Sequence, residues 1–477
     1  MNSKPMQVEK HLINLFTEWS GSKPDQITEL PISASNRSYY RMTAGKISAI
    51  GTYNQDEREN KAFIYLARHF KEKQLPVPEI YAEDLANSVY LQQDLGNLTI
   101  YQQLVGSRKD DDFPNYLLGT YRDVISLLPR FQIEGAKDLD FSQCYPREAF
   151  DRQSMSWDLN YFKYYFLKLA HIPFDEQELE DDFSRFKDYL LSAGHEYFMY
   201  RDFQSRNIML HQGGQWFIDF QGGRRGALQY DLASLLYDAK ADLPVDIREQ
   251  LLNHYIACLK QYKNVNEEKF REEFYAFVYI RIMQAMGAYG FRGFYEKKEH
   301  FLLSIPYALQ NLEWLMENHP IEDQFPALSN VLRGIIASPE IRQAGRKKLS
   351  IEVNSFSYRK GLPVDSSGNG GGFVFDCRAL NNPGRIDQYK LLTGMDEPVI
   401  QFLEQQPEVK PFLDNIFGII DHSVETYIAR NFEHLQINFG CTGGQHRSVY
   451  CAEQLVAHLK SNQNVTLTLN HIEQKFK

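Results

Sequence analysis

The sequence has little cysteine, with five residues in 477, scattered and without a Cys-x-x-Cys pair. An odd, scattered set does not form a disulfide framework, and the missing pairs exclude the common zinc spacings. No apolar run approaches the length needed to span a bilayer, so we expect no membrane association. The N-terminal stretch MNSKPMQVEKHLINLF lacks the basic, apolar and small-residue segments of a secretory signal. We therefore expect reduced thiols and a cytoplasmic protein.

The chain also has fewer basic than acidic residues. The chain has 52 Lys and Arg against 62 Asp and Glu, a formal net charge of −10. Binding to nucleic acid is driven mainly by cations that neutralise phosphates, so this composition does not favour a nucleic-acid partner. Hydrophobic content of 43% and aromatic content of 14% are typical of a globular protein. Because 477 residues exceed the size of a single core, we expect two or more domains.

Two changes of pattern divide the chain. Residues 28–100 read as short strands and turns around one helical stretch at 56–73. Residues 101–335 carry mainly helical periodicity, interrupted by a strand-rich stretch at 196–222. The pattern after the basic run that ends at Lys348 is strand, glycine-rich loop, strand, helices, strand and helix. We therefore predict a boundary near residues 340–348 and a smaller α/β domain after it.

The segment YFMYRDFQSRNIMLHQGGQWFIDFQ holds the most informative spacing. Asp202 precedes Asn207 by five positions, and Asp219 follows a short predicted hairpin. Phosphoryl transfer needs a carboxylate that orients or deprotonates the attacking hydroxyl, and oxygen ligands that hold Mg²⁺ against the phosphates. An isolated Asp or Asn in a turn more often caps backbone groups. The combined spacing, followed by Asp231 in YDLASLL, instead favours a catalytic site with Asp202 as the base and Asn207 and Asp219 as metal ligands.

This segment resembles the aminoglycoside phosphotransferase-like kinases, and among them the anomeric amino-sugar kinases of cell-wall recycling, which phosphorylate N-acetylmuramate or N-acetylglucosamine at C1. The matching motifs are ASNRSYYRM, ERENKAFIYLARHF, YLQQDLG, YRDFQSRNIM and FIDFQ. The resemblance covers about residues 10–335. It implies an α+β bilobal protein-kinase-like domain over 1–340, with a small lobe at about 1–95 and a helical lobe at about 96–340. It also implies ATP (or GTP) and Mg²⁺ as cofactors and an amino sugar as the acceptor.

The resemblance assigns roles by position. Asp202 corresponds to the catalytic aspartate, Asn207 and Asp219 to the Mg²⁺ ligands, and Asp231 to the structural aspartate that braces the catalytic loop. The implied nucleotide-binding residues are Ser35, Asn36, Arg37, Arg41, Glu59 and Gln93.

The sequence departs from this family at two positions. Tyr200 stands where many members have His, and the strand KISAIGTY has Lys46 only at its start, with no lysine at AIG. The hairpin SASNRS also contains no Gly-x-Gly-x-x-Gly. We expect Glu59 to be the helix partner of the absent lysine, and Arg37 or Arg41 to reach the phosphates instead.

The stretch GCTGGQHRS, residues 440–448, has the Cys-x-x-Gly-x-x-Arg-Ser spacing of cysteine phosphatases. It lies between the apolar strand LQINFG and an amphipathic helix predicted to start at Val449. Backbone N–H groups, the helix N-terminus and Arg447 would then surround one point and bind an anion. The same groups would stabilise a thiolate at Cys441, so both a nucleophile and a simple wall of the pocket stay open.

The last part of the chain resembles the RapZ C-terminal domain through four motifs in order: VNSFSYRKGLP, FVFDCRALNNP, LLTGMDEPVIQFLEQQPEV and GCTGGQHRSVYCAEQL. The resemblance spans about 350–477, within a predicted domain at 348–477, and implies a hexosamine phosphate as ligand. The implied ligand-binding residues are Asp376, Arg378, Cys441, Thr442, Gly443, Gly444, His446, Arg447 and Ser448. Gln445 and Gly384 stand where the family commonly has Lys and His.

Some RapZ-like domains also bind a small RNA. Residues 351–477 contain 11 Lys and Arg against 14 Asp and Glu, a net charge of −3, which gives little electrostatic attraction to a phosphate backbone. RNA is therefore a disfavoured partner.

The leading prediction is an ATP-dependent amino-sugar kinase joined to a domain that binds a hexosamine phosphate and regulates the kinase. One alternative is a regulatory binding protein with an inactive kinase-like half and an RNA or protein partner. Another makes the C-terminal domain a cysteine phosphatase, which would need Asp376 or Asp396 as general acid. A homo-oligomer is compatible with each of them.

Overall fold

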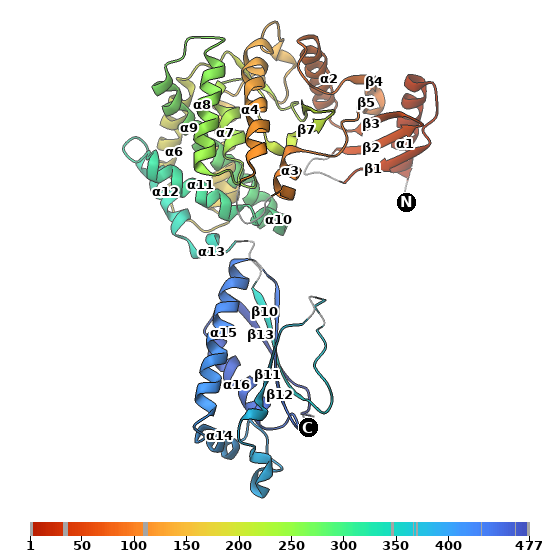
Figure 1. The fold of residues 1–477 in the computed structure, drawn as a ribbon. Helices are drawn as coiled ribbons and strands as arrows, with labels where there is room; N and C mark the ends of the chain where they lie inside the picture. Colours follow the sequence, from red (N-terminus) through yellow and green to blue (C-terminus); the bar gives the residue numbers. More distant parts are fainter. Residues whose placement is uncertain are drawn as a thin grey trace. The chain divides into compact units, whose positions relative to one another are not determined.

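The computed structural model forms two compact units, Met1–Gly345 and Arg346–Lys477 (Figure 1). Each unit has its own hydrophobic core. The structure describes residues 3–31, 37–107, 113–344, 348–365, 367–368, 371–430, 432–462 and 464–474. Among these residues, no helix has both the length and the apolar character needed to cross a bilayer.

The small lobe of the first unit is an antiparallel sheet with strand order β1-β2-β3-β5-β4. Its strands are β1 (Gln26–Glu29), β2 (Ser38–Ala44), β3 (Ile47–Tyr53), β4 (Ile80–Asp84) and β5 (Val89–Gln93). The helix α1 (Ser3–Ser20) packs against β3, β4 and β5. The second helix, α2 (Glu57–Glu72), begins at a capping residue, Asp56, whose carboxylate accepts hydrogen bonds from two backbone N–H groups of the first turn.

The second lobe is mainly helical and surrounds a large apolar core. Its helices are α3 (Ile100–Ser107), α4 (Asn115–Pro129), α5 (Arg152–Phe162), α6 (Glu176–Leu191), α7 (Leu228–Leu236), α8 (Val245–Leu259), α9 (Glu267–Tyr289), α10 (Glu299–Leu302), α11 (Ile305–Asn318), α12 (Pro326–Ala337) and α13 (Pro339–Arg342). The long helix α9 contacts α5, α7 and α11 and is buried on most of its circumference, which explains why its sequence shows no one-sided apolar stripe.

The predicted strand-rich stretch of this lobe is present as two short antiparallel pairs. β6 (Tyr197–Met199) pairs with β9 (Arg224–Gly226), and β7 (Ile208–His211) pairs with β8 (Gly214–Phe217). The two residues that join β7 to β8, Gln212 and Gly213, both have positive φ angles. Two such residues in sequence form the turn that fits the twist of a tight hairpin.

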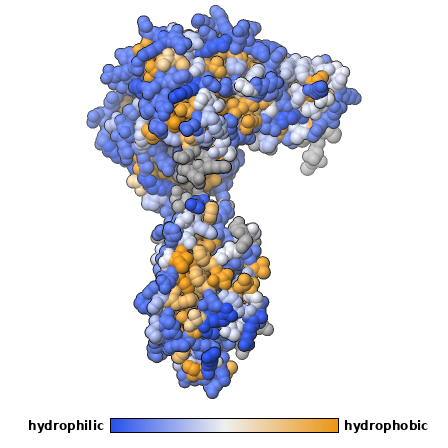
Figure 2. Space-filling view, in the orientation of Figure 1, coloured by the Kyte–Doolittle hydropathy of each residue, from blue (hydrophilic) through white to orange (hydrophobic). Residues whose placement is uncertain are grey.

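The second unit is a parallel sheet with strand order β11-β12-β10-β13. Its strands are β10 (Leu349–Ser357), β11 (Phe373–Asp376), β12 (His434–Cys441) and β13 (Val465–His471), and its helices are α14 (Glu397–Glu404), α15 (Val409–Ala429) and α16 (Arg447–Leu459). The helices lie on one side of the sheet (Figure 1). The surface of this unit gathers apolar side chains on the face shown in Figure 2, and its exposed apolar residues include Leu362, Val364 and Val374.

The predicted fold class is confirmed: a bilobal kinase-like unit of helices and antiparallel sheet is followed by a smaller α/β unit. The helix after the glycine-rich loop begins at Arg447, two residues before the predicted Val449.

Candidate active site and phosphate cradle

The β7–β8 hairpin brings Asn207 and Asp219 together. Ile208 pairs with Phe217, and the backbone N–H of Ile218 donates to the carbonyl of Asn207 over 3.1 Å, so the residues just outside the hairpin are neighbours. Asn207 Nδ2 donates to Asp219 Oδ2 (3.2 Å) and to the backbone carbonyl of Asp202 (2.8 Å). Because the amide nitrogen is used in these two bonds, Asn207 keeps its Oδ1 as a free oxygen ligand.

Asp202 lies in the loop between β6 and β7. Asp231 stabilises this loop through hydrogen bonds to its backbone. Asp231 is fully buried at the start of α7 and accepts hydrogen bonds from the backbone N–H groups of Tyr200 (2.8 Å) and Arg201 (2.9 Å) and from Gln132 Nε2 (3.3 Å). Burial raises the pKa of Asp231 to about 7, although these hydrogen bonds favour the carboxylate.

The backbone on both sides of the site is strained. Arg201 and Asp219 have φ angles of 80° and 70°, values that side-chain-bearing residues adopt only when their surroundings force them. Arg201 is held by Asp158, which accepts two hydrogen bonds from its guanidinium at 2.6 and 2.7 Å, and by the Tyr230 hydroxyl at 2.6 Å. Strain of this kind concentrates at functional sites, where the fold supplies the energy to maintain it.

Tyr200, the residue that replaces the common His, links the loop to the strand that precedes Asp219. Its hydroxyl donates to the carbonyl of Ile218 over 2.6 Å, and its ring is buried against Phe203 and Phe220. Phe220 in turn stacks on Phe63 of α2 at 4.9 Å. The loop, the β8 end and the small-lobe helix are therefore packed as one block.

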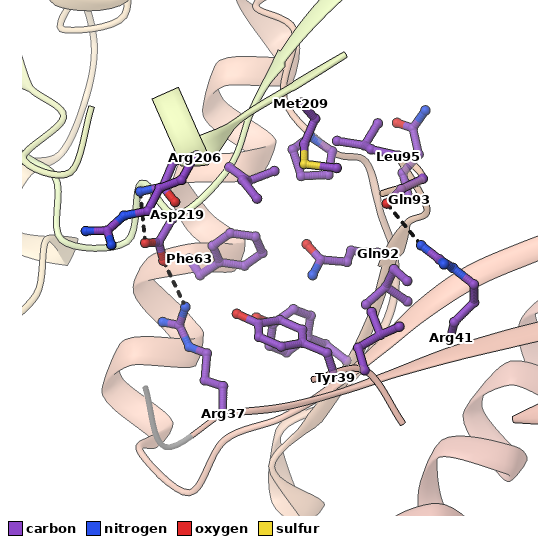
Figure 3. Close-up of a pocket in the computed structure, with 17 residues that line it drawn as sticks. Arg37, Tyr39, Arg41, Phe63, Gln92, Gln93, Leu95, Arg206, Met209 and Asp219 are labelled. Atoms are coloured by element: carbon purple, nitrogen blue, oxygen red, sulfur yellow. Dashed lines mark hydrogen bonds and ion pairs between the residues drawn. The ribbon is translucent and has the colours of Figure 1, made fainter. Parts of the chain in front are cut away.

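The buried side chain of Arg37 lies between Glu59 of α2 and Asp219. It is 3% exposed, and its guanidinium contacts Glu59 of α2 at 2.8 Å and Asp219 at 3.6 Å. Glu59 also accepts a hydrogen bond from Asn54 Nδ2 at 2.7 Å. A cation directly before β2 thus links Glu59 of α2 to Asp219, which lies two residues after β8. Figure 3 shows its contact with Asp219.

A cavity of about 370 Å³ lies between the two lobes (Figure 3). Its lining is mostly apolar, with Arg37, Asn207 and Asp219 together at one end and Arg41 on the opposite side. The full lining is Leu30, Arg37, Tyr39, Arg41, Ile50, Phe63, Pro78, Tyr90, Gln92, Gln93, Leu95, Gly96, Arg206, Asn207, Met209, Ile218 and Asp219. A flat apolar slot with a polar end suits a nucleotide, with its base in the slot and its phosphates at the charged end.

Of the remaining predicted nucleotide-binding residues, two line the cavity and two lie outside the described residues. Arg41 is tied to Asp94 at 2.8 Å and also to the carbonyl of Gly96, so it stabilises the segment after β5. Gln93 lines the cavity. Ser35 and Asn36 lie outside the described residues.

A second cavity, of about 220 Å³, adjoins the first. Its lining is Tyr101, Asp202, Gln204, Arg206, Asp238, Lys240, Arg281, Gln284, Ala285, Ala288, Tyr289, Phe301 and Ser304. Asp202 faces only this cavity, Asn207 and Asp219 face only the first, and Arg206 lines both. Sequence reasoning missed Arg206, although its place directly before Asn207 in the loop was the available signal.

In the second unit, parallel register brings the predicted ligand residues to one edge of the sheet. Ser357 is opposite Cys441, and Asp376 is opposite Gly440. The loop that follows turns at Gly444, whose φ is 67° and where a Cβ would lie 3.0 Å from backbone atoms of β10. Thr442 is fixed by its carbonyl, which accepts from the Ser357 hydroxyl at 2.8 Å.

The Cys441 sulfur sits inside its own loop. It is 3% exposed, and it contacts Ser448 Oγ at 3.1 Å and the backbone N–H of Gly444 at 3.2 Å. Burial alone would raise the pKa of this thiol, but hydrogen bonds from Ser448, Gly444 and Gly443 outweigh it and lower the pKa. The loop therefore stabilises negative charge at its centre, and Gly443 is exposed at its rim.

The other predicted side chains of the loop are occupied by neighbouring backbone. His446 Nε2 lies 2.9 Å from the Tyr389 carbonyl, and Arg447 Nη1 donates to the carbonyls of Arg378 and Leu380 at 3.1 and 2.9 Å. Arg378 itself is half-exposed and paired with Asp376 at 2.6 Å. Arg447 thus fixes the turn that presents Arg378.

The arrangement does not supply the general acid that a phosphatase needs. The ion pair with Arg378 lowers the pKa of Asp376, which keeps that carboxyl ionised. Asp396 accepts from both the N–H and the hydroxyl of Thr393, at 2.6 and 2.8 Å. Asp376 is therefore not a ready proton donor, and Asp396 is engaged by Thr393.

Comparison with known proteins supports both units. Residues 26–266 match the phosphotransferase enzyme family, and residues 349–475 match the RapZ C-terminal domain. A curated nucleotide-binding protein of Janthinobacterium sp. is 37% identical over 139 residues, which are 29% of this chain and 46% of that protein. The corresponding protein of Marinobacter nauticus is 40% identical over 123 residues, 25% of this chain and 40% of that protein. The chain therefore covers less than half the length of these curated relatives.

Among solved structures, a choline kinase from Cryptosporidium parvum Iowa II is 12% identical, with a TM-score of 0.45, and the match covers 62% of this chain and 92% of that one. The family match over residues 26–266 takes in just over half of the 477 residues. The chain belongs to the phosphotransferase enzyme family, with a RapZ C-terminal domain after it.

Proposed function

We propose that this protein is an ATP-dependent kinase that phosphorylates an amino sugar similar to N-acetylmuramate or N-acetylglucosamine, with the C1 hydroxyl as the candidate position, and that its second unit binds a hexosamine phosphate. The observation that carries the proposal is the division of the catalytic loop between two cavities. Asn207 and Asp219 face the nucleotide-sized cavity, whereas Asp202 faces the smaller one. A nucleotide and an acceptor could thus meet at one loop.

In this proposal Asp202 orients the acceptor hydroxyl and receives its proton. The hydroxyl oxygen forms a new bond to the γ-phosphorus while the bond from phosphorus to the ADP oxygen breaks. The Asp202 carboxylate accepts no hydrogen bond from any described residue, so its oxygens are available for that hydroxyl. Asp231 keeps the loop in the strained shape that aims this carboxylate.

Mg²⁺ fits the residues at the charged end of the first cavity. Asn207 Oδ1 and the Asp219 carboxylate offer oxygen ligands from adjacent positions, and Mg²⁺ commonly takes only one or two protein ligands, with phosphates and waters for the rest. When bound, the ion would neutralise charge on the phosphates during transfer. Asp219 already faces one cation, Arg37, which supports a position beside the phosphates.

Arg37 also bears on the alternative of an inactive kinase-like half. That alternative is motivated by the missing lysine, but Arg37 supplies a buried cation that pairs with Glu59. Arginine donates in a fork that matches phosphate geometry, so it can replace a lysine at this position.

The second unit is proposed to bind the phosphate of a hexosamine phosphate at the rim of the loop around Gly443, with Arg378 beside it. We infer that this binding regulates the kinase, because both units would then handle related ligands. Kinase rates that stay constant over a wide range of glucosamine 6-phosphate concentrations would remove the regulatory part of the proposal.

The decisive experiment measures ATP consumption by the full chain with a panel of hexosamines and their N-acetyl and lactyl derivatives. We expect turnover with at least one amino sugar and a product whose phosphate position is assigned by NMR. No transfer to any member of the panel, with ATP bound, would favour the regulatory binding protein instead.

A further inference from the structure

The cavity next to Asp202 gathers cations that have no carboxylate partner. Arg206, Lys240 and Arg281 line it. Within the described ranges, none of these three forms an ion pair with Asp or Glu. Arg206 donates to the amide of Gln204, and Lys240 Nζ reaches only the His300 carbonyl, at 3.4 Å.

Arg281 is the most constrained of the three. It projects from α9, is only 7% exposed, and donates to two neutral groups, Ser234 Oγ at 3.0 Å and Gln284 Oε1 at 2.6 Å. Arg201, another buried guanidinium of this lobe, is instead matched by Asp158. Burying a cation without a counter-charge is costly, so the position of Arg281 needs another explanation.

Two carboxylates also face this cavity, Asp202 and Asp238. Together they carry two negative charges against the three positive charges of Arg206, Lys240 and Arg281. Burial, and after it the nearby Arg206, lowers the pKa of Lys240, while Asp238 acts in the opposite direction. The cavity therefore has an excess of positive charge that an acceptor can satisfy.

We propose that this cavity selects an acceptor that carries an anionic oxygen group, a carboxylate or a phosphate, bound by Lys240 and Arg281 while the acceptor hydroxyl faces Asp202. The inference rests on the proposed kinase function and narrows its substrate class. A volume of about 220 Å³ lies below that of a drug-sized site and suits one sugar unit. An acceptor bearing amines would meet the same cations and be repelled.

The test compares an anionic sugar with its uncharged ester and with a sugar phosphate. N-acetylmuramate, its uncharged methyl ester and N-acetylglucosamine 6-phosphate are titrated calorimetrically into the full chain in the presence of Mg²⁺ and a non-hydrolysable ATP analogue. We expect at least one anion to bind about tenfold or more tightly than the ester, as expected for hydrogen bonds to a charged group. Which anion binds more tightly identifies the carboxylate or the phosphate as the recognised group.

Variants assign the effect to residues. Lys240→Gln and Arg281→Gln should each reduce the anion-to-ester affinity ratio about tenfold, and Arg281→Lys should restore part of it. Arg271→Gln, on the same helix and paired with Glu249 outside this cavity, is the matched control and should keep the wild-type ratio.

Equal binding of acid and ester, no binding of either anion, or an unchanged ratio in both Gln variants would overturn the inference. The readout needs no turnover. Charge-selective binding without any phosphoryl transfer would therefore refute the proposed kinase activity and leave this specificity intact.

Discussion

The carboxylate of Asp202 has no hydrogen-bond partner within the described chain, whereas Cys441, His446 and Arg447 are each bound by neighbouring groups of their own unit. Both sites lie in a loop between a strand and a following element, and both are supported by buried polar residues. They differ in which groups remain available. The kinase-like loop leaves the Asp202 carboxylate without a partner in the described chain, whereas in the cradle the N–H groups of Gly443, Gly444 and Ser448 already donate to the Cys441 sulfur.

This difference separates two tasks. A group that exchanges protons or holds a metal must have unused lone pairs, and the support has to come from elsewhere, as Asp231 supplies it here. In a loop that only recognises an anion, backbone N–H groups can contact the anion. Its side chains can then stabilise the conformation of the loop. In the proposed binding domain, Cys441 would accept hydrogen bonds from these N–H groups and stabilise the shape of the loop.

The largest expected effect comes from removing the free carboxylate. Asp202→Asn should lower kcat by about two to four powers of ten, because general-base catalysis contributes on this scale. Affinity for ATP should change little, since Asp202 does not line the nucleotide cavity. Steady-state kinetics and nucleotide titration check both statements. Asp246→Asn, at an exposed position early in α8, is the control; full activity in Asp202→Asn would remove the assignment of the site.

A smaller effect is expected when the buried cation beside Asp219 is removed. Arg37→Met should reduce kcat/KM for ATP by about ten- to hundredfold, the loss of hydrogen bonds to a charged group. Arg37→Lys should recover part of it, because the charge remains but the fork geometry does not. If the Met and Lys variants are equally impaired, the contribution of Arg37 depends on the geometry of its guanidinium and not on its charge alone.

The cradle should respond to a change of backbone shape. Gly444→Ala should lower the free energy of unfolding of the second unit by about 1–3 kcal/mol, since a side chain there is strained at positive φ and contacts β10 backbone. Gly443→Ala is the matched control, because its Cβ would meet nothing within 4 Å. Calorimetric unfolding of the full chain measures both, and equal stability of the two variants would contradict the role given to Gly444.

The smallest effect concerns protonation of Cys441. Its thiolate should form at a lower pH than that of an ordinary cysteine, and Ser448→Ala should move that pKa upward by removing a hydrogen bond to sulfur. Since the folded-state pKa is depressed, the thiolate adds stability at alkaline pH, and this is lost as pH falls through the folded pKa. Thiolate absorbance during a pH titration measures the shift.

Cys377 provides the reference for that titration. Burial raises the pKa of this thiol well above its usual value, so Cys377→Ser should not alter the low-pH step. Loss of the low-pH step in Cys377→Ser, or its persistence in Cys441→Ser, would show that the titration does not belong to Cys441.

Much of the fold was predictable because its signals are local. The spacing of Asp202, Asn207 and Asp219 is set by one hairpin, and the order of strand, glycine loop and helix around Cys441 is continuous in sequence. The partners of these residues were not predictable in the same way. Arg37 meets Glu59 and Asp219 only after three separate elements pack together.

The orientation of individual side chains was also not predictable from the sequence. The spacing around Cys441 placed Arg447 near an anion, but its Nη1 bonds the backbone of the turn after β11, which sequence spacing cannot reveal. The second cavity likewise depends on α9, whose burial on most sides hides the position of Arg281 from any periodicity.

The two-residue turn at Gln212 and Gly213 has a consequence for how this enzyme family member can be altered. Strand pairing has a period of two, so one residue added to or removed from that turn would rotate Asn207 or Asp219 to the opposite face of the hairpin. The length of this exposed turn thus determines whether the side-chain oxygens of Asn207 and Asp219 lie close together. In the proposed kinase, a change of length in that loop would therefore disturb the metal-binding pair while Asp202, Asn207 and Asp219 all stay in the sequence.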